Sequence, residues 1–481
     1  MKITISQKDL SDILSLVNYA VPNKPYHPIL NNVLLIADKD NQKIAIAAFD
    51  LSLGIRVECK CKIENDGMIA LPAKLLAQLV SNLPKQDINL EIVDNTAILT
   101  HSSGKCRIQT VNPQEFPSLP QAGGKTITLS AVKLLQALEA TLFAASHDET
   151  KLVLAGVHFK FARNYWEAAA TDGHRLAVAS GTIELSEESN GNAKDEFESD
   201  TVKVTIPYQT LTELQKILAS VGEDCECTIS IDNGIAVFDL ANIQITSRLL
   251  SGEYPQYASF IPQQFQHQFT IDRKVFDNAL KRVGIVADQK DKIVAINFDY
   301  TNQQATLSTE SQDVGGAVES VLIKAESNFQ HNLLIGFNIK YITDALKFIP
   351  TDEVLLQANR PTTPVIIIPV GGILNQLILV MPIELIATKA AIIENSSEIN
   401  EEPVITEDIL PTTEVATATT EIADEVEIAA KVMEETAIEE NVEIITNSSA
   451  PESTEETTTT SPSPSTPTTK PKGRKKKAEA A

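Results

Sequence analysis

The residue types best suited to chemistry lie in the string T-D-G-H-R-L that begins at Thr171. Asp172 and His174 stand two residues apart, and a carboxylate beside an imidazole can act as a general acid and base. His147 and Asp148 form a second such pair. A hydrolase would also need a nucleophile motif, a phosphate-binding glycine loop or a set of metal ligands, and the sequence contains none of these. We therefore expect no enzymatic activity, and substituting Asp172 or His174 tests the hydrolase alternative.

The five cysteines include two pairs whose spacing suggests a metal site. Cys59 with Cys61, and Cys225 with Cys227, are each two residues apart, so on a strand both members of a pair point to one face. A structural zinc site needs more ligands at tetrahedral spacing, and no Cys or His cluster completes either pair. We expect buried thiols, with no metal and no other cofactor.

Compartment is inferred from the cysteines and the N-terminus. Five cysteines in 481 residues, with no charged-then-apolar leader ahead of Ile3, predict a cytoplasmic protein. The most apolar stretch, from Val365 to Ala387, is interrupted by Pro369 and Glu384. Because a membrane span needs an almost unbroken apolar run, we expect two core strands here and no membrane association.

The string T-D-G-H-R-L is predicted to connect two strands of a hairpin. Asp172 and Gly173 lie between apolar runs, and Gly173 tolerates the positive φ of a tight turn.

A strand that runs directly into an amphipathic helix is predicted six times, in two alternating forms. The first form starts at Lys2, Lys125 and His267, and the second at Ile69, Val204 and Leu334. Matching positions of the first form are about 124 and 142 residues apart, a normal domain length, so three similar domains are expected. Pro72 and Pro207 are predicted at the first helical position. The helices are predicted over 6–20, 72–83, 129–143, 207–219, 272–284 and 338–348.

The net charge of −24 is unevenly distributed. Residues 386–481 hold twenty acidic and eight basic side chains, which is half of the imbalance. The six predicted helices hold ten basic and seven acidic side chains, so they are slightly positive in an acidic protein. Any surface helix carries lysines, and helices that share a surface facing a polyanion would do so as well. The charge distribution alone leaves both explanations open.

The predicted helix from Asp272 illustrates how its side chains divide. Val275, Phe276, Ala279, Leu280 and Val283 are expected to form the buried stripe. Lys274 and Lys281 then lie on other faces and reach solvent.

Two segments are predicted to lie outside the packed domains. Residues 387–481 are acidic, then rich in Pro, Ser and Thr, then basic from Lys470 to Lys477, a composition that predicts a disordered tail. The basic cluster either contacts nucleic acid or keeps the tail soluble. Residues 184–200 are predicted to be an acidic surface loop inserted into the middle domain.

Several strings together resemble the sliding-clamp family, the beta subunits of bacterial DNA polymerase III. They are P-N-K-P-Y-H-P-I-L-N-N-V, N-P-Q-E-F-P-S-L-P, T-D-G-H-R-L-A, S-G-E-Y-P-Q-Y and L-V-M-P-I-E-L, spread over residues 1 to about 385. The resemblance implies an α+β chain of three DNA-clamp domains, 1–121, 122–262 and 263–386, with helices lining a pore and antiparallel sheets outside. It also implies a homodimer ring that encircles duplex DNA and tethers the replicative polymerase, which confers processivity without catalysis.

The resemblance also assigns roles to individual residues. Partner proteins, such as the polymerase III catalytic subunit and the clamp loader, would insert a peptide into a pocket between the second and third domains. Its wall corresponds to Leu154, Thr171, Gly173, His174, Arg175, Leu176, Pro255, Phe260, Leu379, Met381, Pro382 and Ile383. Lys24, Lys74 and Lys151 correspond to DNA-binding positions, and Ile108 of one subunit would meet Ile285 and Val286 of the other.

The chain departs from the family pattern at several positions. Tyr208, Gln209 and Ser259 stand where relatives carry bases, and Glu384 replaces a usual basic residue. A scaffold protein whose acidic tail does the binding is an alternative function, and it predicts no retention on DNA.

Overall fold

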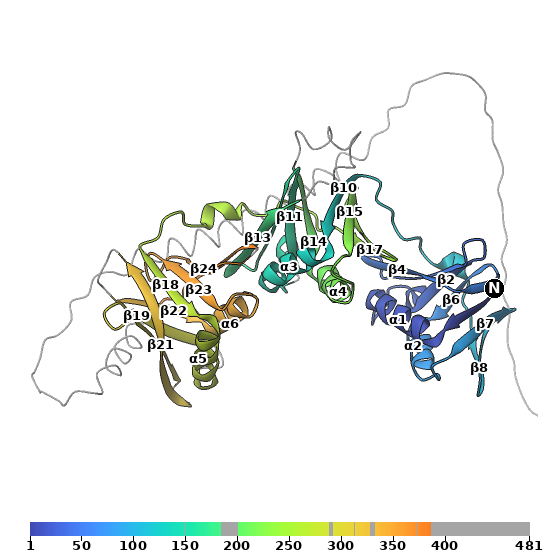
Figure 1. Cartoon of the computed structure of the whole chain (residues 1–481), viewed down its shortest axis with the longest axis horizontal. Helices are drawn as coiled ribbons and strands as arrows, with labels where there is room; N and C mark the ends of the chain where they lie inside the picture. The colour runs from blue at the N-terminus through green and yellow to red at the C-terminus, as the bar shows by residue number, and fades with distance from the viewer. Residues whose placement is uncertain are drawn as a thin grey trace, which may run out of the picture. The chain divides into compact units, whose positions relative to one another are not determined.

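The computed structural model describes residues 1–148, 150–183, 201–287, 292–311, 313–327, 332–372 and 374–385. Within these ranges the chain forms three repeats of strands and helices in similar order (Figure 1). The fold therefore has the α+β composition that the sequence predicts. The predicted acidic loop at 184–200 and the predicted tail at 387–481, with its Lys470 to Lys477 cluster, lie outside the described residues.

The first repeat is mostly strands, with a helix after its first strand and another after its sixth. Its strands are β1 (Lys2–Ser6), β2 (Asn32–Asp38), β3 (Lys43–Phe49), β4 (Leu53–Lys60), β5 (Lys62–Asn65), β6 (Gly67–Pro72), β7 (Asp87–Val93), β8 (Thr96–His101) and β9 (Gly104–Gln109). Its helices are α1 (Gln7–Val17) and α2 (Ala73–Ser81), with the 3₁₀ turns η1 (Asn18–Ala20), η2 (Pro28–Asn31) and η3 (Pro113–Glu115).

The second repeat has its helices after its first and fifth strands and contains the predicted hairpin. Its strands are β10 (Lys125–Ser130), β11 (Gly156–Ala162), β12 (Tyr165–Thr171), β13 (Arg175–Thr182), β14 (Val202–Pro207), β15 (Glu226–Asp232), β16 (Ile235–Leu240) and β17 (Ile243–Arg248). Its helices are α3 (Ala131–Thr141) and α4 (Tyr208–Leu218), with the 3₁₀ turns η4 (Leu142–Ala144), η5 (Leu152–Leu154) and η6 (Tyr257–Phe260).

The third repeat has one strand, a helix, four strands, a second helix and three strands. Its strands are β18 (His267–Asp272), β19 (Ile293–Asp299), β20 (Gln304–Ser311), β21 (Gly315–Ser327), β22 (Leu333–Asn338), β23 (Glu353–Ala358), β24 (Val365–Pro369) and β25 (Asn375–Val380), and its helices are α5 (Arg273–Val286) and α6 (Ile339–Lys347). The apolar stretch from Val365 thus contains two strands, as predicted. No helix in the described ranges is both long and apolar enough to cross a membrane.

The strands form three sheets, and every strand pair among the described residues is antiparallel. Their orders are β5-β1-β7-β8-β9, β10-β15-β16-β17-β4-β3-β2-β6 and β14-β11-β12-β13-β25-β24-β23-β18-β21-β20-β19-β22. Two sheets pass from one repeat into the next: β17 pairs with β4, and β13 pairs with β25. The repeats are therefore joined by continuous backbone hydrogen bonding.

The helices begin and end close to their predicted limits. Five predicted spans contain the observed α-helix, and α5 runs two residues further, to Val286. Asp272 and Asn338 cap α5 and α6 by accepting hydrogen bonds from Val275 N and Lys340 N. Pro72 and Pro207 were expected inside the first turn, but their ψ angles of 112° and 139° belong to the preceding strands. Each helix therefore starts one residue after its proline.

The helices pack in pairs, α1 with α2, α3 with α4 and α5 with α6, and each pair packs against strands of its own repeat (Figure 1). Helix α5 buries Phe276, Ala279, Leu280 and Val283. The expectation that Val275 is buried was wrong, because it lies about 100° around the helix from Phe276 and is exposed.

Candidate functional site

An apolar surface follows the strand pair that joins the second and third repeats. Along β13 and β25, Leu176 lies opposite Leu379, and Val178 lies opposite Leu377. Because alternate residues of a strand share a face, these four side chains lie on one side of the sheet. They belong to a second hydrophobic cluster, separate from the main core, which we call the seam cluster. Its buried members are Ala169, Leu176, Tyr254, Tyr257, Ile366 and Leu379, and Val153, Leu154, Val178, Ile261, Phe265, Ile368, Leu377 and Met381 pack against them.

A hollow of about 500 Å³, which we call the seam groove, continues this surface along the two strands. It is lined by Val178, Ser180, Ile261, Ile368, Pro369, Gly371, Gly372, Leu374, Asn375, Gln376 and Leu377. Most of these side chains are apolar, so the groove suits a ligand that buries apolar groups.

Four residues predicted for the partner pocket, Leu154, Leu176, Leu379 and Met381, belong to or pack against the seam cluster. Phe260 lies on η6 and is largely exposed, which leaves its ring available to a ligand. The structure thus brings together much of the predicted apolar wall.

Two further predicted residues, Pro382 and Ile383, follow Met381 directly. Ile383 N donates to Gly336 O at 2.8 Å. Gly336 permits this approach, since a Cβ there would lie 2.4 Å from the Ile383 carbonyl oxygen. This contact fixes the chain just beyond β25 against β22.

Two tyrosines hold the linker between β17 and β18 over the seam cluster. Tyr254 accepts a 3.0 Å hydrogen bond from Thr171 N, and Tyr257 donates to Glu167. Burial alone would raise the pKa of Glu167, but hydrogen bonds from Tyr257, Tyr165 and Lys160 lower it overall. Pro255 lies between the two anchored tyrosines, so their contacts position it.

The loop Thr171 to Arg175 is shaped by its own side chains. One carboxylate oxygen of Asp172 accepts from His174 N at 2.9 Å and from Arg175 N at 3.1 Å. Gly173 has a φ of +93°, so the predicted hairpin and its glycine are confirmed. Met381 N donates to His174 O at 2.9 Å, which joins this loop to the end of β25.

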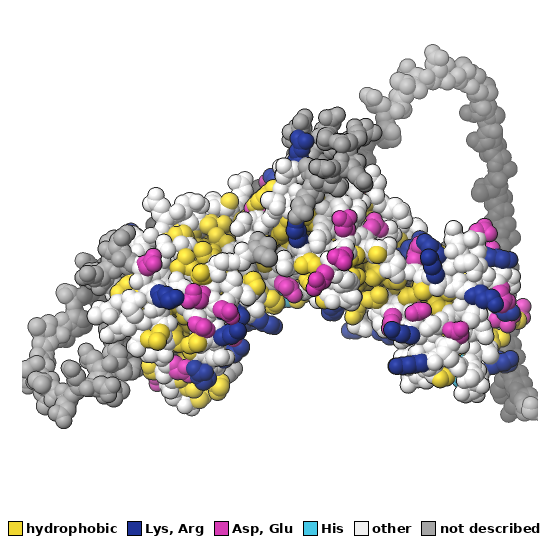
Figure 2. Space-filling view, in the orientation of Figure 1, with side chains coloured by type: hydrophobic (Ala, Val, Ile, Leu, Met, Phe, Trp, Pro, Cys, Tyr) yellow, Lys and Arg dark blue, Asp and Glu magenta, His cyan; other side chains and the backbone are white. Residues whose placement is uncertain are grey.

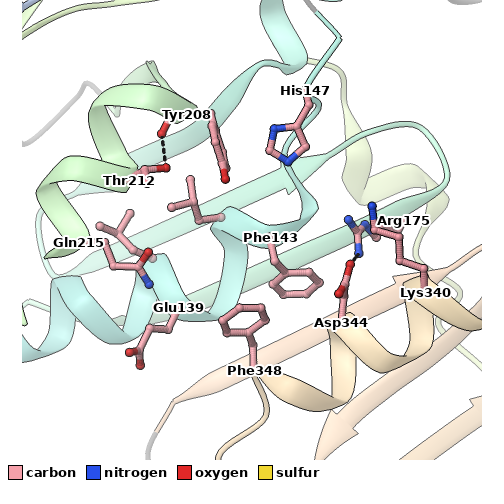
Figure 3. A pocket seen from close by; sticks show the side chains of 12 residues that line it. Glu139, Phe143, His147, Arg175, Tyr208, Thr212, Gln215, Lys340, Asp344 and Phe348 are labelled. Atoms are coloured by element: carbon pink, nitrogen blue, oxygen red, sulfur yellow. Dashed lines mark hydrogen bonds and ion pairs between the residues drawn. The ribbon is translucent and has the colours of Figure 1, made fainter. Parts of the chain in front are cut away.

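Arg175 points away from the seam cluster. Arg175 and Leu176 are neighbours on β13, and successive side chains of a strand face opposite sides of the sheet. The Arg175 side chain lines a second cavity, of about 240 Å³, between α3, α4 and α6 (Figure 3). The Arg175 side chain thus lies on the helix side of the sheet, and its place in the wall of the partner pocket stays a prediction.

The two candidate acid–base pairs are occupied with structural contacts. The second carboxylate oxygen of Asp172 accepts from Arg175 Nε at 3.0 Å, and the His174 ring stacks on Tyr341. Hydrogen bonds from Thr150 lower the pKa of Asp148, and the His147 ring packs edge-on against Tyr208. Neither geometry positions a carboxylate to activate its neighbouring imidazole.

The three lysines predicted to bind DNA fall in two places. Lys24 is exposed in a loop, and Lys74 on α2 donates to Asn23 Oδ1 beside it at 2.9 Å. Lys151 lies in the second repeat, where its Nζ is 3.5 Å from the carbonyl oxygen of Asp172. Lys24 and Lys74 are thus neighbours, whereas Lys151 adjoins the hairpin loop.

Several of the other helix bases are ion-paired within the chain. Lys216 pairs with Glu213, Lys274 with Asp352, Lys281 with Asp277 and Arg282 with Glu319. In Figure 2 the basic side chains on the helix-bearing side are interspersed with acidic ones. These bases are therefore balanced locally, a pattern suited to weak contacts with an anion.

Tyr208, Gln209 and Ser259 lie at the start of α4 and on η6. Gln209 and Ser259 are exposed, whereas Tyr208 is half-buried and lines the 240 Å³ cavity. Glu384 is exposed at the end of the described chain.

The residues predicted at the subunit interface differ in accessibility. Ile285 on α5 is 75% exposed, Val286 is half-buried, and Ile108 on β9 is buried in the first repeat's own core. Ile108 therefore offers no free side chain in the single chain, although the strand that carries it lies at a sheet edge.

All five cysteines lie in the described ranges and are free thiols. Burial raises the pKa of the Cys61 thiol to about 11, so it stays protonated at neutral pH. In those same ranges no three His, Cys, Asp or Glu side chains gather as metal ligands would.

Comparisons with known proteins identify the family. The three domains of the DNA polymerase III beta subunit match in order: the N-terminal domain at residues 1–120, the central domain at 128–256 and the C-terminal domain at 258–382. The chain belongs to the DNA polymerase III beta subunit family. Members of this family are DNA sliding clamps, so the chain is a non-catalytic processivity factor in DNA replication.

Individual relatives agree over their full lengths. The beta sliding clamps of Synechococcus elongatus and Synechocystis are each 39% identical to this chain, covering 80% of it and all of the relative. A sliding clamp from Bartonella birtlesii is 28% identical, covers the same shares and has a TM-score of 0.72. The sliding-clamp resemblance seen in the sequence is thus confirmed.

Several residues that shape the site have no role that the sequence alone predicts. Tyr254 and Tyr257 lie within the string S-G-E-Y-P-Q-Y, whose tyrosine spacing was the available signal. Asp344 meets Arg175 across 169 residues, and nothing local to either residue indicates the pair.

Proposed function

We propose that two copies of this chain close head to tail into a ring around duplex DNA. The supporting observation is the way the repeats join. Strand β4 of the first repeat pairs with β17, and the corresponding β13 of the second repeat pairs with β25. By the same order, β21 of the third repeat corresponds to β4 and β13, and β9 of the first corresponds to β17 and β25.

These two corresponding strands lack the equivalent partner. Among the described residues β9 pairs only with β8, and the 315–322 part of β21 pairs only with β20. An open strand edge is a template for pairing with another chain. A second copy supplies β9 to β21 and β21 to β9, so two identical contacts close the ring.

Apolar side chains near β21 support an interface there. Leu322 and Ile285 are 74% and 75% exposed, and Val314 and Val318 are also exposed on or beside β21. Helix α5, which carries Ile285 and Val286, packs on β21. We infer that Ile285 and Val286 join the contact, and that β9 contributes its backbone edge while Ile108 supports it from within.

The helix face is the surface proposed to meet DNA. Lys24, Lys74 and Lys151 are its first candidate contacts. A ring retains DNA topologically, so a few salt-sensitive phosphate contacts without base specificity are enough and allow sliding. The domains would be 1–121, 122–262 and 263–386.

The seam is proposed as the site for partner peptides. A sliding clamp from Bartonella birtlesii has been crystallised bound to griselimycin, so a related clamp binds a ligand. The seam cluster and seam groove provide an apolar surface here, with Leu154, Leu176, Leu379, Met381 and Phe260 as principal contacts. Partners would be the polymerase III catalytic subunit, the clamp loader and other proteins with clamp-binding peptides, in the cytoplasm.

Retention on DNA tests the ring. Protein loaded by a clamp loader onto nicked circular DNA should remain bound through gel filtration and should be lost once the circle is cut. Equal loss from circular and linear DNA would contradict encirclement and favour a scaffold that does not hold DNA. Loss only after linearisation is expected.

A further inference from the structure

We propose that Arg175 is a positioning residue: it fixes the hairpin loop to helix α6, so that Asp344, on the helix side of the sheet, sets the affinity of the seam for partner peptides on the other side. The inference rests on the proposed peptide-binding function. It differs from a contact role because Asp344 and Arg175 face away from the seam cluster.

The guanidinium of Arg175 joins two carboxylates from different repeats. Its Nε donates to Asp172 Oδ2 at 3.0 Å. Its Nη1 donates to Asp344 Oδ2 at 2.7 Å, the contact drawn in Figure 3. Arg175 is only 5% exposed. A buried charge that loses one partner is left partly uncompensated. Removing the Asp344 carboxylate should therefore shift the Arg175 guanidinium and, with it, Asp172.

Aromatic rings fix the plane of the guanidinium. The Phe143 ring lies 5.4 Å away and the Tyr341 ring 5.0 Å away, measured from ring centre to Arg175 Cζ. Phe143 comes from the second repeat and Tyr341 from α6 of the third. Tyr341 also stacks on His174, with ring centres 5.8 Å apart. The loop is therefore held to α6 at both His174 and Arg175.

The same loop leads directly into the seam. Asp172, held by Arg175, accepts the backbone hydrogen bonds of His174 and Arg175 that define the turn. The His174 carbonyl accepts from Met381 N, and Leu176 is the next residue along β13. A shift of Arg175 is thus transmitted through one loop to Leu176 and Met381, two groups of the seam cluster.

The 240 Å³ cavity beside Arg175 gives the guanidinium room to move if Asp344 is neutralised. Glu139 lines the same cavity and provides another carboxylate. The rings of Phe143 and Tyr341 restrain the plane of the guanidinium, and the ion pair with Asp344 restrains its position along that plane on the helix side.

The test measures binding of a fluorescein-labelled peptide that carries the clamp-binding sequence of the polymerase III catalytic subunit, by fluorescence anisotropy, to the full chain. Asp344→Asn should weaken binding about five- to tenfold, a typical size for coupling between sites. Arg175→Ala should weaken peptide binding about tenfold or more. Arg175→Lys should have an affinity between those of Arg175→Ala and the unsubstituted chain, because lysine keeps the charge but cannot contact two carboxylates as the guanidinium does. The double variant should bind no more weakly than Arg175→Ala alone.

A matched control and a second readout separate positioning from general destabilisation. Asp352→Asn removes a carboxylate from the exposed Lys274 pair in the same repeat and should leave affinity within about twofold of the unsubstituted chain. Asp344→Glu keeps the charge and should restore part of the affinity. Amide hydrogen exchange at His174 and Arg175 should accelerate in Asp344→Asn and stay unchanged in Asp352→Asn.

Two results would overturn the inference. If Asp344→Asn binds as the unsubstituted chain does while Arg175→Ala does not, Arg175 acts by direct contact. If the effects of Arg175→Ala and Asp344→Asn are additive, the two residues act independently. Failure of the unsubstituted chain to bind the peptide would instead refute the proposed partner site.

Discussion

The backbone N–H of Thr171 donates a 3.0 Å hydrogen bond to the phenolic oxygen of Tyr254, 83 residues further along the chain. This contact ties the linker that carries Pro255 and Phe260 to the end of β12. Tyr254 is buried, and burial raises the pKa of its hydroxyl well above the usual value. The hydroxyl is therefore neutral at any physiological pH, and it serves the fold as an acceptor.

Tyr254→Phe should destabilise the protein by about 1–2 kcal/mol, since the ring is kept while the part-buried Thr171 N–H loses its acceptor. Urea denaturation followed by circular dichroism measures the free energy of unfolding. Tyr26→Phe is the control, because Tyr26 is almost fully exposed. Equal stability of the two variants would show that the Thr171 hydrogen bond contributes nothing.

Truncating the seam should weaken partner binding without releasing DNA. Leu176→Ala and Met381→Ala are each expected to cost about 1–3 kcal/mol of peptide binding energy, as buried anchors do. Isothermal titration calorimetry with the polymerase peptide checks this. Leu152→Ala, at an exposed leucine on η5, should bind normally. Retention on circular DNA should survive in all three variants.

Ile285→Asp should separate the proposed pair of subunits. We expect the dissociation constant of the dimer to rise by roughly 100-fold or more, because burying an unpaired carboxylate in an apolar contact costs several kcal/mol. Sedimentation velocity over a range of concentrations gives the result. Val275→Asp places the same charge on an exposed position of the same helix and should remain paired. A dimeric Ile285→Asp protein would exclude Ile285 from the interface.

Stability should fall below neutral pH because of His158. Burial lowers the pKa of His158 to about 4, and Lys160 and Lys203 add to the effect. Between the unfolded pKa of about 6.5 and this folded value, the unfolded chain takes up a proton that the folded chain does not. The stabilisation is therefore complete above pH 6.5 and is lost as the pH falls toward 4, by up to about 3 kcal/mol.

His158→Asn isolates this contribution. Burial also lowers the pKa of His267, so the unsubstituted protein and the variant share that part of the pH dependence. The difference between their urea midpoints should shrink from pH 7 to pH 4.5. A difference that stays constant over this range would show that His158 titrates normally.

Local patterns in the sequence predict much of the fold. The six helices follow from apolar periodicity and from the polar or proline residue before each of them, and the hairpin at Gly173 follows from a dipeptide that only a turn explains. Val275 was misplaced because a stripe of residues does not specify how wide a face the sheet covers.

The site was predictable only in part. Leu176 and Met381 were recognised by their strings, but a string does not state on which face of a strand each side chain lies. Arg175 was assigned to the partner pocket from its string alone, and the string gave no sign of its contacts with Asp344 and Phe143. Contacts of this kind depend on how two repeats meet, and no local pattern of residues encodes them.

The open edges of β9 and β21 have a kinetic consequence for a closed pair. Each subunit would be held by two subunit interfaces, so a break at one interface leaves the two chains attached at the other. Reclosure is then intramolecular, at an effective concentration far above that of free protein. An interface that opens briefly would reclose before the second interface breaks. The lifetime of the ring would therefore exceed that of either interface alone.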